Sequence, residues 1–229
     1  MLTQLKKQVF EANMLLKEYA LVTLTWGNVS GIDRDKGIVV IKPSGVDYDT
    51  MRWEDMVCVE LSTGMVIEGG LRPSSDTPTH IEIYSGFDMV GGVVHTHSRW
   101  ATILAQGGYT IPVFGTTHAD YFYGEIPLTR QLRDEEIDVD YEKQTGRLII
   151  ETFKENDPKT VAAVLVRGHG PFCWGDDPLK AVENALVLEE VSMIAYHNIL
   201  LDRDLGSISQ TLLDRHYYRK HGKDAYYGQ

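Results

Sequence analysis

The sequence predicts an α/β fold in a single domain that covers residues 1–229. Short β-branched apolar runs alternate with longer segments whose apolar residues recur at helical spacing. The chain contains neither internal repeats nor a low-complexity linker, and it is long enough to bury a substantial hydrophobic core. We therefore expect one compact domain.

Composition narrows the class of protein. The formal net charge of −11 argues against a general nucleic-acid or anionic-membrane binder, but it leaves room for a small phosphorylated substrate. The two cysteines, Cys58 and Cys173, do not form a C-x-x-C pair, so we expect no disulfide framework. No apolar run approaches the ~18–20 residues of a membrane span, and the first residues lack an apolar signal core. We expect a soluble cytoplasmic protein with no nucleic-acid or membrane partner.

The N-terminal part of the chain predicts one helix and several strands. Residues 2–19 predict an amphipathic helix, because Leu5, Val9 and Leu16 recur at helical spacing and charged residues fill the other face. A Ser-Thr-Gly turn joins two of the predicted strands into a hairpin. Alternating or β-branched runs predict strands at residues 21–25, 37–41, 57–61 and 65–68.

The rest of the chain predicts mainly helices around buried strands. Residues 77–85 predict a helix, because threonine is a good N-cap and the proline after it suits the first helical position. Residues 91–96 predict a buried strand, since Val93 and Val94 form an apolar run beside glycines. Further helices are expected at residues 98–106, 134–141, 148–153, 178–198 and 209–221, and a further buried strand at 161–166.

A His-x-His sequence lies at the end of the strand at 91–96. Side chains two apart in a strand point the same way, so His95 and His97 share one face. Two adjacent imidazoles on a rigid element suit a transition metal, although such a pair is weak by itself. His169 lies between two glycines just after the strand at 161–166, where it either reaches a site or belongs to a simple turn.

Asp76 directly precedes the helix at 77–85. By itself it is more simply a carboxylate that caps this helix. Combined with the three histidines, it completes a set that suits Zn²⁺, with Mn²⁺, Co²⁺ or Fe²⁺ as substitutes. The predicted metal ligands are Asp76, His95, His97 and His169.

Candidate hydrogen-bond donors for a phosphate occur in three segments, of which the last adjoins Asp76. Gly27 allows close approach of the backbone, and a Lys-Pro-Ser-Gly turn begins at Lys42. Ser74 and Ser75 precede a helix start, where backbone N–H groups favour an anion. Each segment is also consistent with an ordinary turn. The predicted donors are Asn28, Lys42, Ser44, Ser74 and Ser75.

The segment 111–124 is aromatic and apolar but contains His118 and Asp120. An acid in an apolar setting is a candidate for a perturbed pKa. His118 is more simply interpreted as a hydrogen-bonded structural histidine.

Seven short motifs, spread in order along essentially the whole chain, carry a family resemblance. They are Gly27-Asn28, Pro43-Ser-Gly45, Ser74-Ser-Asp76, His95-Thr-His97, Gly115-Thr-Thr-His-Ala-Asp120, His169-Gly-Pro-Phe172 and Tyr226-Tyr-Gly-Gln229. With these motifs the chain resembles the L-ribulose-5-phosphate 4-epimerases of the class II aldolase/epimerase superfamily. The segment that ends at Asp120 and the C-terminal tail are more specific than the His-x-His sequence.

The resemblance implies a class II aldolase-like three-layer α/β/α fold with a central, largely antiparallel sheet. It also implies a homotetramer with active sites at subunit interfaces and a Zn²⁺ cofactor bound by the four predicted ligands. Asp120 and Tyr227 match the family's acid/base pair, and Tyr227 would reach a neighbouring subunit's site. Residues that match substrate- and phosphate-binding positions are Gly27, Asn28, Ser44, Gly45, Ser74 and Ser75.

The chemistry implied by the resemblance is epimerisation at C4 of a ketopentose phosphate. C4 has no acidifying neighbour, so the C3–C4 bond is cleaved by a retro-aldol step and re-formed after the fragment rotates, with the metal as Lewis acid. Two acid/base groups on opposite faces are required, and Asp120 and Tyr227 are the candidates. The expected reaction interconverts L-ribulose 5-phosphate and D-xylulose 5-phosphate, in arabinose or ascorbate breakdown.

Three other interpretations remain. Class II aldolases for a sugar 1-phosphate such as fuculose phosphate share the three histidines but carry a glutamate where this chain has Asp76. Adducin head domains share the fold without catalysis, but they lack the metal histidines. A cupin could also use a His-x-His sequence, although the long helix at 178–198 fits an all-β fold poorly.

Overall fold

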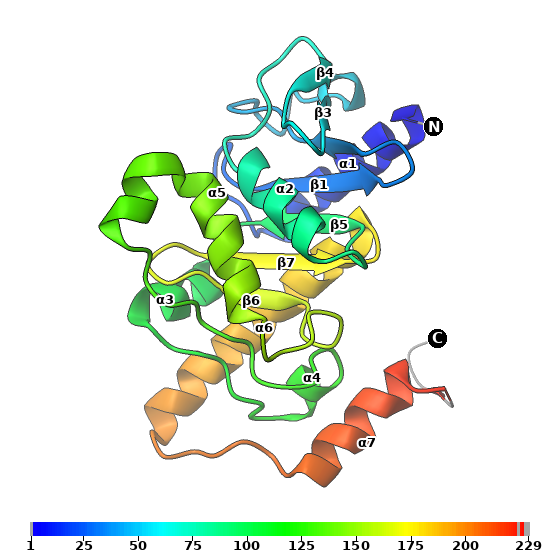
Figure 1. Cartoon of the computed structure of the whole chain (residues 1–229). Coiled ribbons are helices and arrows are strands. Elements are labelled where there is room, and N and C mark those ends of the chain that lie inside the picture. Colours follow the sequence, from blue (N-terminus) through cyan, green and yellow to red (C-terminus); the bar gives the residue numbers. More distant parts are fainter. Residues whose placement is uncertain (1, 224, 227–229) are drawn as a thin grey trace.

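The computed structural model describes residues 2–223 and 225–226, and one antiparallel sheet forms its centre (Figure 1). The strand order is β4-β3-β2-β1-β5-β7-β6, and neighbouring strands pair antiparallel throughout. The strands are β1 (Asn28–Asp33), β2 (Ile38–Ile41), β3 (Val57–Glu60), β4 (Val66–Glu68), β5 (Gly92–His95), β6 (Ala163–Leu165) and β7 (Pro171–Gly175).

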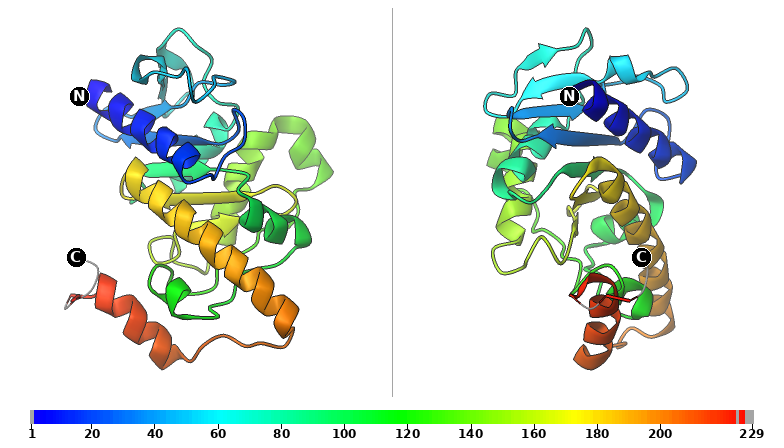
Figure 2. Two further views of the ribbon diagram at one scale, coloured as in Figure 1. Left: turned by 180° about the vertical axis from the view of Figure 1, so that it is seen from behind. Right: turned by 90° about the vertical axis from the view of Figure 1, so that its right-hand side faces the viewer.

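Helices cover both faces of the sheet. Figure 1 shows α2 and α5 in front of it, and the view from behind in Figure 2 shows α1 and α6 across the opposite face. The expected three-layer α/β/α architecture is confirmed. The helices are α1 (Leu2–Glu18), α2 (Thr77–Gly86), α3 (Arg99–Gly107), α4 (Thr116–Ala119), α5 (Asp134–Thr152), α6 (Pro178–Leu201) and α7 (Gln210–His221), with a short 3₁₀ turn at Trp53–Asp55.

The central strands are buried on both faces, which explains their nearly continuous apolar character. In the register of β1 against β5, Val29 lies opposite Val94, and all four residues of β5 are buried. On the other side of β5, Val93 lies opposite Trp174 of β7. The apolar core therefore surrounds the strand that ends at His95.

The N-terminus of α6 packs directly on the backbone of β5. A Cβ atom at Gly92 would lie 2.4 Å from the nitrogen of Pro178 and 2.5 Å from the carbonyl carbon of Asp177. The close approach therefore requires glycine at this position. The predicted start of α6 is confirmed, because the side chain of Asp177 accepts a hydrogen bond from the backbone nitrogen of Lys180 at 2.8 Å.

Two strand predictions were wrong. Residues 21–25 form no strand, because Leu24 has a φ of 55° and the backbone turns there, with Trp26 N–H donating to the carbonyl of Thr23. The strand starts instead at Asn28. Strand β7 was missed because its flanking Gly-His-Gly-Pro sequence is typical of a turn; Pro171 is tolerated as the first residue of a strand.

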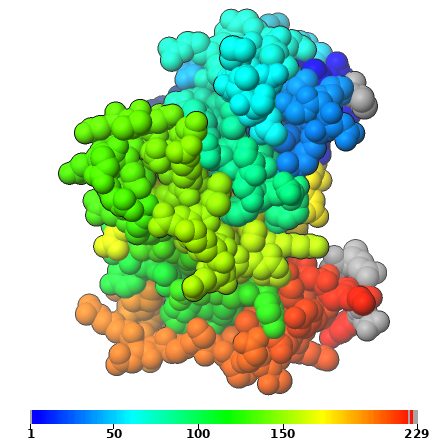
Figure 3. All heavy atoms as spheres, viewed as in Figure 1, coloured from blue at the N-terminus to red at the C-terminus, as the bar shows by residue number. Residues whose placement is uncertain are grey.

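The predicted helices at 134–141 and 148–153 are parts of one element, α5. The element is kinked at Asp140, whose φ of −165° and ψ of 77° are not helical. At one end of the molecule lies the β3–β4 hairpin, and at the other lies α7 (Figure 3). Within the described part of the chain, none of the helices has the length and apolarity needed to span a membrane.

Candidate metal centre

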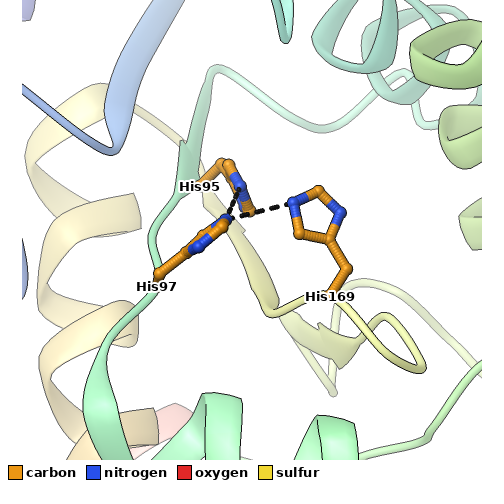
Figure 4. A group of neighbouring side chains, drawn as sticks. All are labelled: His95, His97 and His169. Carbon is orange, nitrogen blue, oxygen red and sulfur yellow. Dashed lines mark hydrogen bonds between the residues drawn. The ribbon is translucent and has the colours of Figure 1, made fainter.

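Three histidine side chains from two neighbouring segments point toward one another (Figure 4). His95 is the last residue of β5, His97 follows two residues later, and His169 lies in the turn between β6 and β7. The Nε2 atom of His97 lies 3.1 Å from Nε2 of His95 and 3.1 Å from Nε2 of His169. Two nitrogens that bind one tetrahedral ion at ~2.0–2.1 Å lie about 3.3 Å apart, so this spacing fits a shared metal ion.

The turn that carries His169 is fixed by its backbone. The N–H of His169 donates to the carbonyl of Val166 at 3.0 Å, and the N–H of Val166 donates to the carbonyl of Gly170 at 2.9 Å. Gly168 has a φ of 74°, a left-handed conformation that favours glycine. The backbone conformation of Gly168 therefore helps to orient the His169 ring.

Hydrogen bonds at Nδ1 leave the Nε2 atoms available for a metal. Nδ1 of His95 donates to the carbonyl of Pro171 at 2.9 Å, and Nδ1 of His169 lies 3.1 Å from the hydroxyl of Tyr141. The ring of His95 also stacks on Phe172, with ring centroids 4.1 Å apart. Such outer contacts orient metal-binding imidazoles and select their tautomer.

Burial keeps the three imidazoles neutral, which is the form that binds metals. It lowers the pKa of His95 and His97, and the repulsion between neighbouring rings adds to the effect at His97. At His169, burial and the other two rings lower the pKa to about 3. At neutral pH each of the three imidazoles therefore has a nitrogen lone pair that can bind a metal ion.

Asp76 lies at the N-cap position of α2, but its side chain makes no capping hydrogen bond. Its Oδ2 instead accepts from Nδ2 of Asn28 at 2.6 Å. Asn28 is paired directly opposite His95 in the sheet, so Asp76 lines the same cavity as the histidines. Among the described residues, however, the group of ligand atoms within 4.8 Å of one another contains the three histidines and not Asp76. Burial raises the pKa of Asp76, but His95, His80 and the Asn28 bond outweigh burial and hold it below its usual value. The carboxylate is therefore ionised.

One cavity of about 490 Å³ brings the predicted metal and phosphate residues together. We call it the histidine cavity. Its walls come from β1, the 42–45 turn, the segment before α2, β5 and the β6–β7 turn. The predicted residues that line it are Gly27, Asn28, Lys42, Ser44, Gly45, Ser74, Ser75, Asp76, His95, His97 and His169.

The two serine-containing loops of this cavity are joined by backbone hydrogen bonds. Ser44 N–H donates to the carbonyl of Arg72 at 2.9 Å, and Ser74 N–H donates to the carbonyl of Lys42 at 3.0 Å. The buried Nζ of Lys42 donates to backbone carbonyls, of which Val46 is the nearest at 3.1 Å. Burial lowers the pKa of Lys42 to about 8. In this chain the ammonium therefore holds the turn that presents the serine.

Tyr141 and Glu142 also line the histidine cavity, and sequence reasoning missed both. They lie in the first turn after the kink of α5, and the hydroxyl of Thr79 in α2 donates to the carbonyl of Glu142 at 2.6 Å. The sequence carries no signal for this approach, because it depends on how two distant helices pack.

Asp120 lies outside the histidine cavity, at the C-terminal end of α4. Its carboxylate accepts from Nδ1 of His216 at 3.0 Å and from Nη2 of Arg219 at 2.8 Å, both on α7. The Nε2 atom of His221 lies 2.9 Å from the Asp120 carbonyl. We call these four residues the Asp120 cluster. Burial raises the pKa of Asp120, but Arg219 and His216 outweigh burial and lower it.

Two further predictions concern His118, which lies in α4, and Tyr227. His118 is buried, and its Nε2 donates to the carbonyl of Gly124 at 2.8 Å, as expected for a structural histidine. Tyr227, the second predicted acid/base residue, lies outside the described residues.

A family model described as the class II aldolase and adducin N-terminal domain matches residues 7–196. The chain belongs to this family. The match includes every predicted metal- and phosphate-binding residue of this class II aldolase domain, whereas α7 and the tail lie beyond it.

Solved structures with a class II aldolase fold are similar over nearly the whole chain. An L-fuculose 1-phosphate aldolase superposes with a TM-score of 0.79 at 21% identity, over 95% of this chain and 96% of that one. An l-fuculose-1-phosphate aldolase from Thermus thermophilus has a TM-score of 0.69 at 24% identity, and the match covers 89% of this chain and 100% of that one. A sugar-phosphate aldolase from Thermotoga maritima has a TM-score of 0.64 at 18% identity, and the match covers 88% of this chain and 97% of that one. At these identities the likeness concerns the fold.

Proposed function

We propose that the protein is a metal-dependent epimerase that interconverts L-ribulose 5-phosphate and D-xylulose 5-phosphate by cleaving and re-forming the C3–C4 bond. One observation carries the proposal: a single cavity is lined both by three converging imidazoles with a carboxylate and by serine loops suited to a phosphate. This combination fits a phosphorylated substrate whose carbonyl end lies near a metal.

In the proposal, Asp76 and the three histidines hold Zn²⁺, with Mn²⁺ or Co²⁺ as replacements. Three neutral nitrogens and one ionised carboxylate are a donor set that Zn²⁺ accepts. The bound ion would supply Lewis acidity that stabilises negative charge as it develops on a substrate oxygen. Asn28 would keep the carboxylate turned toward the histidines through its 2.6 Å hydrogen bond.

The serine loops would hold the substrate phosphate throughout the reaction. Ser74 and Ser75 precede the N-terminus of α2, where backbone N–H groups and the helix dipole favour an anion. Ser44 lies on the facing loop, next to Gly45. An epimerase must retain its cleaved fragment while the aldehyde turns over, and a fixed phosphate provides that retention.

Asp120 would act as one acid/base group and Tyr227 as the other. The contacts of Asp120 with Arg219 and His216 keep its carboxylate ionised, which a proton acceptor requires, although its lowered pKa makes it a weaker base. Because Asp120 does not line the histidine cavity of its own chain, the proposal includes a homotetramer in which the Asp120 cluster serves a neighbouring subunit's cavity.

A second candidate is a class II sugar-phosphate aldolase. It is favoured by the names of similar structures, two of which are L-fuculose 1-phosphate aldolases. The aspartate at position 76 favours the epimerase, because it is one methylene shorter than a glutamate and accepts a hydrogen bond from Asn28.

One paired assay separates the candidates. Metal-loaded protein is given L-ribulose 5-phosphate with a coupled detection of D-xylulose 5-phosphate, and separately L-fuculose 1-phosphate with detection of dihydroxyacetone phosphate. Formation of xylulose 5-phosphate alone supports the epimerase, and release of dihydroxyacetone phosphate alone supports the aldolase. If neither assay forms a product, both proposals are wrong, and the result favours a non-catalytic, adducin-like domain.

A further inference from the structure

The three imidazoles of the histidine cavity are held in place by different kinds of contact. Nδ1 of His95 is hydrogen-bonded to a backbone carbonyl, and Nδ1 of His169 lies beside a tyrosine hydroxyl. Within the described part of the chain, the hydrogen bonds of the His97 side chain involve Nε2 alone and join it to the other two rings. The position of His97 therefore depends on the backbone that carries it.

That backbone becomes α3 two residues after His97, and a side chain from α6 caps this helix. Ser98 is at the N-cap position, but its hydroxyl makes no capping hydrogen bond. The two carboxylate oxygens of Glu189 instead accept from the backbone nitrogens of Trp100 at 2.9 Å and Ala101 at 3.0 Å. These are the N–H groups that an N-cap side chain normally engages, and a negative charge is favourable at a helix N-terminus.

Helix α3 also contacts the segment that carries His169. The carbonyl of Ala105, near the end of α3, accepts the backbone N–H of Gly168 at 3.2 Å. Gly168 directly precedes His169 in the turn between β6 and β7. One helix therefore joins the backbone of His97 to the turn that presents His169, and a shift of α3 would change the position of both imidazoles.

Helix α6 is a common support for α3 and for the strand that carries His95. Its N-terminus packs on β5 at Gly92, and three turns later Glu189 binds the start of α3. The ring of Trp100 also lies 5.4 Å from the ring of Tyr196 on α6. Glu189 is partly buried and does not line the histidine cavity, so substrate binding does not explain it.

We propose that Glu189 is a positioning residue of the metal centre: by fastening the first turn of α3 to α6, its carboxylate holds the backbone of His97 where the ring can share one metal ion with His95 and His169. The 3.1 Å spacing of the three Nε2 atoms depends on this backbone, because His97 has no contact at Nδ1 comparable to those of the other two rings. The inference rests on the metal-binding part of the proposed function and not on epimerisation.

The test compares Glu189→Ala, which removes both acceptor oxygens, with Glu189→Gln, which keeps one. Zn²⁺ and Co²⁺ affinities are measured by competition with a chromophoric chelator, together with the Co²⁺ absorption spectrum. We expect Glu189→Ala to bind either metal ~10-fold more weakly and to change the Co²⁺ spectrum, and Glu189→Gln to lie between it and wild type. Glu190→Ala, at the exposed neighbouring position of α6, should match wild type. Equal affinities and spectra for wild type and Glu189→Ala would overturn the inference.

A second control separates positioning from ordinary helix capping. Ser209 caps α7, where its side chain accepts from the backbone nitrogen of Leu212, and it does not line the histidine cavity. Ser209→Ala should lower the stability of the metal-free protein in urea but leave metal affinity and the Co²⁺ spectrum unchanged. An equal loss of affinity in Ser209→Ala and Glu189→Ala would contradict the inference. If Glu189→Ala does not fold, Glu189→Gln decides, with an expected several-fold loss of affinity; an unchanged affinity in that variant would then overturn the inference.

The same measurements separate the two proposals. Wild-type protein that binds metal but shows no epimerisation removes the proposed activity and leaves the role of Glu189 standing. Wild-type protein that binds metal no more tightly than the Glu189 variants removes only the role of Glu189. Wild-type protein that binds no metal overturns both.

Discussion

The histidine cavity and the Asp120 cluster are built in opposite ways. The cavity lies where buried strands end, and its imidazoles are aimed by backbone carbonyls, a stacked ring and a tight turn. The Asp120 cluster joins the four-residue helix α4 to α7, and charged contacts between partly exposed side chains hold it together. In the proposed function, the first region binds the metal and the phosphate, and the second transfers a proton.

In the proposed enzyme, the two regions have separate roles: one binds the metal and the phosphate, and the other supplies the acid/base group. Metal and phosphate binding need only one chain, because every predicted binding residue lines one cavity. The acid/base chemistry needs a carboxylate that the same chain places elsewhere. Substitutions in the two regions should therefore fail in different ways.

The largest effect is expected for His97→Ala. The loss of one of three nitrogens should reduce metal content to near zero and lower kcat/KM at least ~1,000-fold. Mass spectrometry measures the metal content, and the coupled assay measures kcat/KM. His197→Ala is the matched control, because His197 is exposed on α6 and lies outside the histidine cavity, with its Nδ1 2.9 Å from the carbonyl of Met193. A metal-loaded His97→Ala protein would contradict the proposed ligand set.

Asp120→Asn should lower kcat by ~100–1,000-fold and leave metal content unchanged, because it removes a general base and not a ligand. Asp214→Asn is the control, since Asp214 is a carboxylate of α7 that accepts a hydrogen bond from Tyr123. Metal loss in Asp120→Asn would show that the two regions are not separate in the way described.

Mixed oligomers sharpen this comparison. If the Asp120 cluster serves a neighbouring cavity, refolding equal amounts of His97→Ala and Asp120→Asn chains together should restore about a quarter of wild-type activity, since that fraction of shared sites has both intact residues. Sites contained within one chain would restore none.

A smaller effect is expected for Tyr141→Phe. This change removes the hydroxyl that lies 3.1 Å from Nδ1 of His169 and keeps the ring. Outer-shell losses of this kind weaken metal binding ~10-fold, and we expect that value in a chelator competition. Tyr218→Phe on α7 is a control at an exposed tyrosine. Unchanged affinity would indicate that the turn alone orients His169.

The smallest effect concerns pH. Burial lowers the pKa of His118 to about 4, whereas the unfolded chain takes up that proton near ~6.5. Between these values the unfolded state binds more protons, so the stability of the metal-free protein should fall as pH decreases, by up to ~1.4 kcal/mol per pH unit for this group. Urea unfolding at pH 7, 6 and 5 measures the slope. His118→Gln should reduce the slope without abolishing it, because other histidines such as His169 also have a lowered pKa, whereas the exposed-site variant His197→Gln should leave the slope unchanged.

The sequence predicted the residues whose chemistry is local. A His-x-His sequence on a strand predicts two imidazoles on one face whatever the rest of the fold, and the serines before α2 are recognisable from the helix start. The α/β class also followed from periodicity, whereas the three layers were implied by the family resemblance. The family resemblance brought in the antiparallel sheet, which the structure confirms.

What the sequence did not reveal depends on contacts between distant segments. Tyr141 reaches the cavity because α5 is kinked and packs against α2, and the residues around it look like an ordinary acidic helix. The contact of Glu189 with Trp100 joins residues 89 positions apart. The strand predicted at 21–25 was wrong because Leu24 adopts a left-handed turn that its side chain does not suggest.

The contact at Gly92 has a practical consequence for protein engineering. A single methyl group at Gly92, in the strand that ends at His95, would collide with backbone atoms of Asp177 and Pro178 at the start of α6. Substitution should therefore be poorly tolerated at this position, although Gly92 does not line the histidine cavity. A library designed to alter the reaction would do best to randomise the lining of the cavity and hold this glycine constant.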